Sequence, residues 1–151
     1  MASTLVKIDV HLIFHVKTTS IAIREDDLDR LFAYLGGTIR NLQGIPIEIG
    51  GMRDHVHILT SLPKNMSLSD FVRNIKAESS RWLKGMGRVY ADFSWQAGYG
   101  AFSVSPSMTD KTVDYIRNQR KHHERSTFQE EYRRFLNVYN VPYDERYVFT
   151  D

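Results

Sequence analysis

Hydrophobic and polar side chains alternate strictly between residues 5 and 16. The apolar side chains fall on every second position, and they are Val6, Ile8, Val10, Leu12, Phe14 and Val16. Successive side chains of a strand point to opposite faces, so this period of two predicts a β-strand that buries one face. The other face would carry Lys7, Asp9, His11, Ile13 and His15.

A helical period replaces the alternation after residue 25. Acidic residues 25–27 suit the first turn of a helix, and the apolar stripe that follows comprises Leu28, Leu31, Phe32, Leu35, Ile39 and Leu42. A second helix is predicted from Ser67, whose spacing to Asp70 resembles a capping box, to about Gly85. Its apolar stripe comprises Leu68, Phe71, Val72, Ile75, Trp82 and Leu83. Within the first helix, the pair Gly36–Gly37 suggests close packing.

Two further strands lie between these helices, at residues 46–49 and 54–60, and Gly50–Gly51 is predicted to form the turn between them. A fourth strand is expected within the glycine-containing stretch 95–104, because Pro106 would end it. The pattern therefore predicts a hairpin in the middle of the chain and a last strand near residue 100.

Two helices complete the pattern. The first should run from Thr109 toward Arg125, but its apolar residues are few, so it would dock on a partner or move. The second should follow the cap formed by Thr127 and Glu130. Its apolar residues are Phe128, Tyr132, Phe135, Leu136 and Tyr139, and an aromatic tail, 143–149, comes after it.

The order strand, helix, strand, strand, helix, strand, helix is that of a ferredoxin-like (RRM-like) split unit. We therefore expect an α+β fold, an antiparallel sheet covered by helices. A chain of 151 residues with 42% apolar content can bury one core and is too short for two ordinary domains. Residues 1–151 are thus predicted to form one domain, with 126–151 as a C-terminal helix and aromatic tail.

The composition excludes several kinds of chemistry and gives a first expectation for the cellular location. No apolar run is long enough to span a bilayer and no signal region precedes the first strand, so a cytoplasmic protein is expected. The absence of cysteine excludes disulfides, thiolate chemistry and cysteine-ligated metals. A net charge of +2 permits a polyanionic partner without indicating one.

The first candidate for chemistry is a pair of histidines, His55 and His57, separated by one residue on a predicted strand. Both rings would point to the same face while Val56 turns into the core. Imidazole suits first-row divalent ions, and two ligands would leave coordination positions open for a phosphate oxygen. The alternative is an ordinary pair of hydrogen-bonded histidines on a strand.

The second candidate is Tyr115, which stands four residues before Gln119 on the predicted third helix. Residues at this spacing share one helix face. Tyrosine can act as a covalent nucleophile, and an amide oxygen can complete the shell of a metal beside it. No other tyrosine of the chain has a glutamine four residues later. The alternative is a half-exposed helical tyrosine with a polar neighbour.

These two motifs resemble those of the HUH single-tyrosine transposases of small bacterial insertion sequences. The likeness is carried by Asp54–His57 and by Tyr115–Gln119. It extends over most of the chain, through His11–Phe14, Ser79–Leu83, Trp95–Tyr99 and Tyr143–Tyr147.

The resemblance implies a metal-dependent DNA strand transferase. His55, His57 and Gln119 would bind Mg²⁺ or Mn²⁺, and Tyr115 would attack single-stranded DNA to leave a 5′-phosphotyrosine. The DNA partner would carry hairpins at the ends of the element. Two cleavages require two tyrosines, so a homodimer is expected, in which the tyrosine helix of one subunit could complete the site of the other.

Basic residues supply candidate contacts to DNA phosphates. They are Arg73, Lys76, Arg81, Lys84, Arg117, Arg120, Lys121 and Arg125. Trp95, Tyr99 and Phe102 could stack on bases, although core packing is the favoured role. His122–His123 could contact DNA or metal, but a solvated helix end is favoured.

Three other functions stay open at this point. A single-strand nickase or replication initiator would use the same chemistry without mobilising an element. A regulator could bind nucleic acid on the same fold without catalysis. A two-histidine phosphoesterase ranks last, because that chemistry needs two separated His-x-Ser/Thr motifs and the chain has none.

Overall fold

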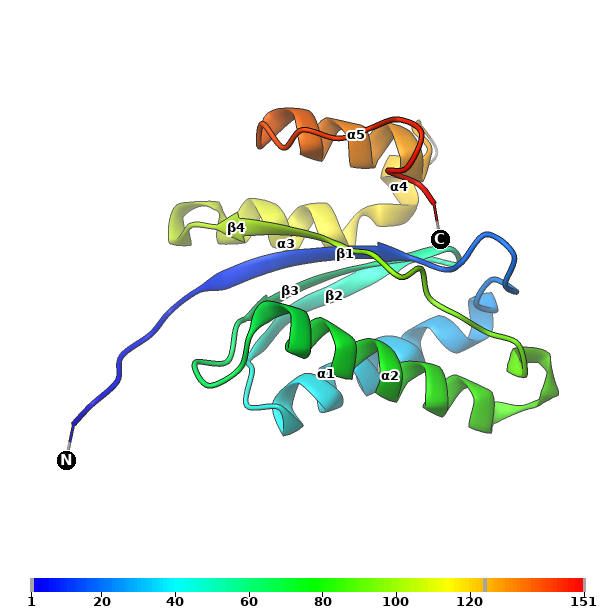
Figure 1. Ribbon diagram of the computed structural model, residues 1–151, viewed down its shortest axis with the longest axis horizontal. Helices are drawn as coiled ribbons and strands as arrows, with labels where there is room; N and C mark the ends of the chain where they lie inside the picture. Colours follow the sequence, from blue (N-terminus) through cyan, green and yellow to red (C-terminus); the bar gives the residue numbers. More distant parts are fainter. Residues whose placement is uncertain (1, 124, 151) are drawn as a thin grey trace.

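A four-stranded antiparallel sheet forms the centre of the computed structural model, which describes residues 2–123 and 125–150 (Figure 1). The strands are β1 (Asp9–His15), β2 (Pro46–Met52), β3 (His55–Ser61) and β4 (Gly100–Val104). They lie in the order β2-β3-β1-β4, and every neighbouring pair is antiparallel. This arrangement confirms the expected α+β, ferredoxin-like fold.

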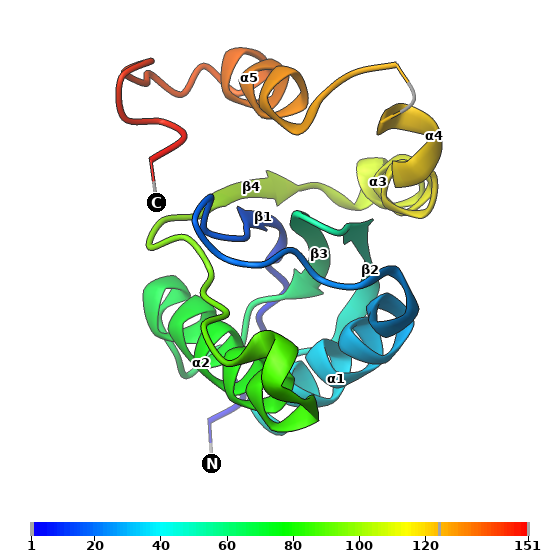
Figure 2. The same cartoon turned by 90° about the vertical axis from the view of Figure 1, so that its right-hand side faces the viewer.

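Helices cover both faces of the sheet. On one face lie α1 (Leu28–Asn41) and α2 (Leu68–Met86), while α3 (Thr109–Arg117), α4 (Gln119–His123) and α5 (Phe128–Val138) lie on the other (Figure 2). Three short 3₁₀ turns, at Glu25–Asp27, Arg88–Tyr90 and Pro106–Met108, precede α1, follow α2 and precede α3. None of the helices in the described residues is long and apolar enough to cross a membrane.

The alternation predicted for the first strand separates two environments. Leu12 and Phe14 of β1 are fully buried in the main hydrophobic core, together with Val56 and Ile58 of β3. From α1 and α2, Leu31, Leu35, Phe71 and Ile75 pack into the same core. Burial of large aliphatic and aromatic side chains contributes about 1.5–3 kcal/mol each, so this face dominates the stability of the fold.

The first strand is shorter than its pattern predicted. Val6 and Ile8 continue the alternation but are about half exposed, and β1 begins only at Asp9. Asp9 pairs with Ser61 at the end of β3 and with Val104 at the end of β4. Neither neighbouring strand extends further; the Leu62 N–H still donates to the carbonyl of Ile8 at 2.7 Å, but within the described residues no strand lies beside Val6.

The predicted glycine turn was wrong. Gly50 and Gly51 lie inside β2, opposite His57 and Val56, and the turn to β3 falls at residues 53–54. A Cβ on Gly50 would lie 2.8 Å from the carbonyl oxygen of Ile116. The glycine therefore lets α3 lie directly against the strand.

The predicted third helix is broken. α3 ends at Arg117, Asn118 leaves helical geometry, and α4 begins at Gln119. The Asn118 side chain donates a hydrogen bond to the carbonyl of Asp114 at 2.8 Å, which caps the end of α3. Tyr115 and Gln119 therefore reach the sheet from two helices.

Candidate active site

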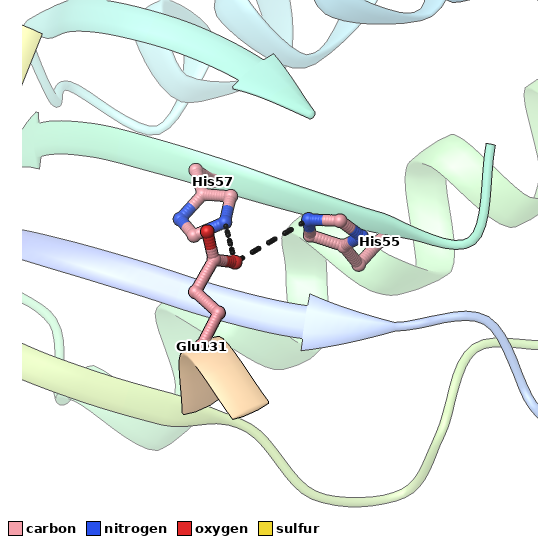
Figure 3. Close-up of side chains that lie close together, drawn as sticks. All are labelled: His55, His57 and Glu131. Atoms are coloured by element: carbon pink, nitrogen blue, oxygen red, sulfur yellow. Dashed lines mark hydrogen bonds and ion pairs between the residues drawn. The ribbon is translucent and has the colours of Figure 1, made fainter. Parts of the chain in front are cut away.

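Strand β3 places His55 and His57 on the sheet face opposite the main core, as their spacing predicted. Both side chains are fully buried, and Figure 3 shows them projecting from β3 toward Glu131. Val56, between them, points into the main core. The two imidazoles therefore share one buried compartment between the sheet and α5.

A carboxylate that sequence reasoning missed enters this compartment from α5. Oε1 of Glu131 lies 2.9 Å from Nε2 of His57 and 3.6 Å from Nε2 of His55 (Figure 3). Glu131 is only 1% exposed. One signal could have identified it: Glu131 lies three residues after Phe128 and four before Phe135, so an acid interrupts the apolar face of the predicted helix.

Tyr115 and Gln119 meet the same carboxylate. The Tyr115 hydroxyl donates a hydrogen bond to Oε2 of Glu131, and Nε2 of Gln119 donates to the same oxygen at 3.2 Å. Oε1 of Gln119 lies 3.0 Å from Nε2 of His55. The structure thus brings together all four residues singled out from the sequence, while their catalytic and ligand roles stay predictions.

The outer ring nitrogens of both histidines are held by further partners. Nδ1 of His55 lies 2.8 Å from a carboxylate oxygen of Asp54, and Nδ1 of His57 lies 2.8 Å from Nε2 of His11. Metal-binding histidines usually have such a second partner, which sets the tautomer and the direction of the ring. Both Nε2 atoms are consequently free to face Glu131 and Gln119. His11, which the alternation placed on the polar face of the first strand, therefore also lies at the site.

Burial shifts the pKa values of several groups in the site. It lowers the pKa of His57 to about 4 despite the hydrogen bond to Glu131, and it also lowers the pKa values of His11 and His123. Burial, together with the charge of Glu131, raises the pKa of Tyr115. For Glu131, burial opposes ionisation, but hydrogen bonds from His57 and Tyr115 hold its pKa below the usual range. At neutral pH His57 is therefore neutral and Tyr115 keeps its proton.

The donor set fits a divalent metal ion. One ligand atom each from His55, His57 and Glu131 lies within 4.8 Å of the others, and all three residues are buried. Neutral imidazoles and an ionised carboxylate are the protonation states that bind metals. The residues present could therefore hold a divalent ion.

The basic residues predicted to contact DNA are distributed over two faces. Arg73, Lys76, Arg81 and Lys84 lie on α2, across the sheet from the histidines, whereas Arg117, Arg120 and Lys121 lie on α3 and α4. Several pair with acids: Arg73 with Asp70, Arg81 with Glu78, Arg117 with Glu48 and Arg120 with Glu25. Their contacts to DNA stay predictions.

Lys76 differs from the other basic residues of α2. Its ammonium donates to the backbone carbonyls of Gln96 and Gly98 at 2.8 and 2.5 Å. Partial burial lowers its pKa to about 8. Among the candidate stacking aromatics, Trp95 and Phe102 are packed in the interior and Tyr99 is half-buried. Packing is therefore the present role of the first two.

Comparisons with known proteins supply independent evidence. The model of a family described as "Transposase IS200 like" matches residues 4–119. No curated protein matches the chain significantly.

Two solved structures share the fold. One comes from Deinococcus radiodurans and is described as a transposase; it has 22% identity and a TM-score of 0.61, over 79% of this chain and 95% of that one. The other is a REP-associated tyrosine transposase bound to a REP hairpin, with 13% identity and a TM-score of 0.59, over 82% of this chain and 73% of that one. At these identities the two likenesses establish the fold.

Proposed function

The chain belongs to the IS200-like transposase family, and from this premise we propose that it cleaves and rejoins single-stranded DNA at the ends of an insertion sequence. Tyr115 would be the nucleophile. His55, His57 and Gln119 would bind Mg²⁺ or Mn²⁺, with Glu131 as an additional candidate ligand. The family match confirms the resemblance read from the sequence, and the family implies an enzyme that cleaves DNA.

One observation carries the proposal. The Tyr115 hydroxyl and the His57 ring nitrogen bind the two oxygens of the same buried carboxylate, that of Glu131. A nucleophile and a metal-binding pair must lie within reach of one phosphate for the reaction to occur. Unrelated surface residues would have no reason to converge on one buried acid.

The proposed step is a transesterification. The Tyr115 oxygen forms a bond to the scissile phosphorus, the bond from phosphorus to the 3′ oxygen breaks, and the phenolic proton is lost while the 3′ oxygen gains one. The phosphodiester linkage is conserved, so no nucleotide cofactor is needed. A divalent ion would supply Lewis-acid stabilisation of the phosphate charge.

The chain's own residues orient and protect the reacting groups. Asp54 and His11 hold the histidine rings through their outer nitrogens, and Glu131 holds the Tyr115 hydroxyl at the site. A groove of about 330 Å³ opens beside Tyr115 and His11 and is flanked by Lys111 and Arg134. We propose that single-stranded DNA enters here, because two cations flank a path to the nucleophile.

The position of Tyr115 beside the histidines of its own chain supports a site completed in cis. The homodimer predicted from the resemblance remains part of the proposal, since two strand cleavages need two tyrosines. DNA hairpins are proposed as the recognised partners because the REP-associated transposase structure contains one.

A covalent adduct tests this function directly. Wild-type protein is incubated with Mg²⁺ or Mn²⁺ and labelled single-stranded DNA from the ends of its own genomic locus, and the products are separated on a denaturing gel. We expect an adduct that disappears with chelator and in Tyr115→Phe. Tyr147→Phe, which changes an exposed tyrosine, should keep it.

The same assay separates the remaining alternatives. Binding without any adduct in wild type would favour the non-catalytic regulator. An adduct without rejoining of element ends would favour the nickase or replication initiator.

A further inference from the structure

His123, the last residue of α4, faces the histidine pair although nothing in its sequence context required this. Its ring centre lies 4.6 Å from that of His55, and Nε2 lies 3.5 Å from Oε1 of Glu131. That nitrogen is buried and has no hydrogen-bond partner. The neighbouring His122 points elsewhere and stacks on the Tyr115 ring at 4.6 Å. A buried ring nitrogen without a hydrogen bond costs free energy unless another partner binds it.

The distances around Glu131 suggest what that partner is. Its Oε1 atom lies 2.9, 3.6 and 3.5 Å from the Nε2 atoms of His57, His55 and His123. First-row divalent ions bind nitrogen and carboxylate oxygen at about 2.0–2.2 Å, so neighbouring ligands of one ion are separated by about 3–3.5 Å. Oε1 of Glu131 therefore lies near the spacing of neighbouring ligands from each of the three imidazole nitrogens.

We propose that His123 is a further ligand of this metal site, so that three imidazoles and the Glu131 carboxylate select a first-row transition ion over Mg²⁺. The inference rests on the metal site of the proposed function. Imidazole suits transition ions such as Ni²⁺ and Zn²⁺, whereas Mg²⁺ takes oxygen ligands and keeps several waters. A ligand set with three nitrogens thus disfavours magnesium.

The position of Gln119 is compatible with this ligand set. Its Oε1 atom lies 3.0 Å from Nε2 of His55, again at the spacing of neighbouring ligands. Even with Gln119 included, a six-coordinate ion would keep one position for a phosphate oxygen. The other reading of His123 is an ion-pair or packing partner of Glu131, in which case its loss would not change metal selectivity.

Metal titration of the full chain distinguishes these readings. Chelator-treated wild type, His123→Phe and His122→Phe are titrated with MnCl₂, ZnCl₂ and MgCl₂ by calorimetry. Phenylalanine keeps a ring in place and removes the nitrogen, and His122→Phe is the matched control on the same helix. We expect wild type to bind Mn²⁺ and Zn²⁺ at least about 100-fold more tightly than Mg²⁺.

In His123→Phe, the affinity for both transition ions should fall about tenfold or more, while Mg²⁺ affinity changes less than about twofold. His122→Phe should match wild type. The visible spectrum of bound Co²⁺ should change in His123→Phe alone, because it reports the number and type of ligands. Equal affinities in wild type and His123→Phe, or equal losses in both variants, would overturn the inference.

Two further measurements keep the test decisive. If His123→Phe does not fold, as judged by circular dichroism, His123→Asn replaces it, because its shorter side chain does not extend to the position of Nε2. The adduct assay on wild type is run in parallel. A His123-dependent metal affinity without an adduct would support this site while contradicting the transposase function, and an adduct with unchanged metal affinity in His123→Phe would do the reverse.

Discussion

The two faces of the central sheet differ in kind although the same strands build both. Toward α1 and α2, β1 and β3 present Leu12, Phe14, Val56 and Ile58, which pack into an apolar core. Toward α5 the same strands present a histidine cluster: His11, His15, His55 and His57. Successive residues of one strand therefore serve different purposes. One side chain stabilises the apolar core, and the next points into the histidine cluster on the other face.

The covering layers differ in the same way. α1 and α2 contact the sheet through aliphatic and aromatic side chains. Burial of these apolar side chains is favourable by itself and holds the two helices against the sheet. α5 combines an aromatic cluster around Tyr132 and Leu136 with the buried Glu131. A buried carboxylate is stable only while hydrogen-bonded, so the docking of α5 depends on the histidines beneath it.

Truncating one phenylalanine on each face should give the largest effect. Phe14→Ala removes a fully buried ring from the main core and should lower the free energy of unfolding by about 3–5 kcal/mol. Phe135→Ala removes a partly buried ring from the α5 side and should cost clearly less. Urea denaturation of both variants measures the difference. Equal losses would mean that the two layers contribute equally to stability.

A pair of glycine substitutions compares the two helical layers with smaller expected losses of stability. Gly50→Ala places a methyl group 2.8 Å from the Ile116 carbonyl oxygen, so α3 must shift away from β2, at about 1–3 kcal/mol. Because α3 carries Tyr115, adduct formation should also fall.

Gly37→Ala is the matched control on the opposite layer. A Cβ at this position of α1 meets no atom within 4 Å, and alanine favours a helix by about 0.5–1 kcal/mol over glycine. We expect slightly higher stability and unchanged adduct formation. Wild-type activity in Gly50→Ala would show that the close approach of α3 does not position the nucleophile.

Acidification should lower the free energy of unfolding through the buried histidines alone. We expect this effect to be smaller than those of Phe14→Ala and Gly50→Ala. The pKa of His57 is about 4 in the folded protein and about 6.5 when unfolded. Between these values the unfolded chain binds more protons, so stability falls as the pH falls. For metal-free protein, the titration of His57 alone should lower the free energy of unfolding by about 1.2 kcal/mol between pH 7 and pH 5.5.

Urea denaturation of chelator-treated protein at both pH values measures this loss. His11 and His123 act in the same direction, because their pKa values are also lowered. His57→Gln should reduce the dependence on pH by the share of one histidine. A stability that does not change over this range would contradict the buried, neutral state of the ring.

The fold was largely predictable from periodicity, because alternation and helical spacing report burial directly. The shared face of His55 and His57 followed from the same rule. Errors occurred where tertiary contacts decide: Gly50 serves the approach of α3, and Val6 has no strand beside it. Local pattern contains neither the register of paired strands nor the distance between layers.

The site was predicted only in part for the same reason. Glu131 lies 74 residues after His57 in the chain, and its partners cannot be read from its own helix. His11 joins the site because β1 pairs with β3 in one particular register. A charged residue on an otherwise apolar helix face was the available sign, and it indicates a buried partner without naming it.

The position of Glu131, after all four strands in the chain, makes the site dependent on α5. Translation produces the strand with both histidines first, then Tyr115 and Gln119, and Glu131 after them. A transcript cut short before codon 131 would encode the four strands and both histidines without the carboxylate that gathers them. Damaged copies of the gene would therefore yield proteins with an unfinished site.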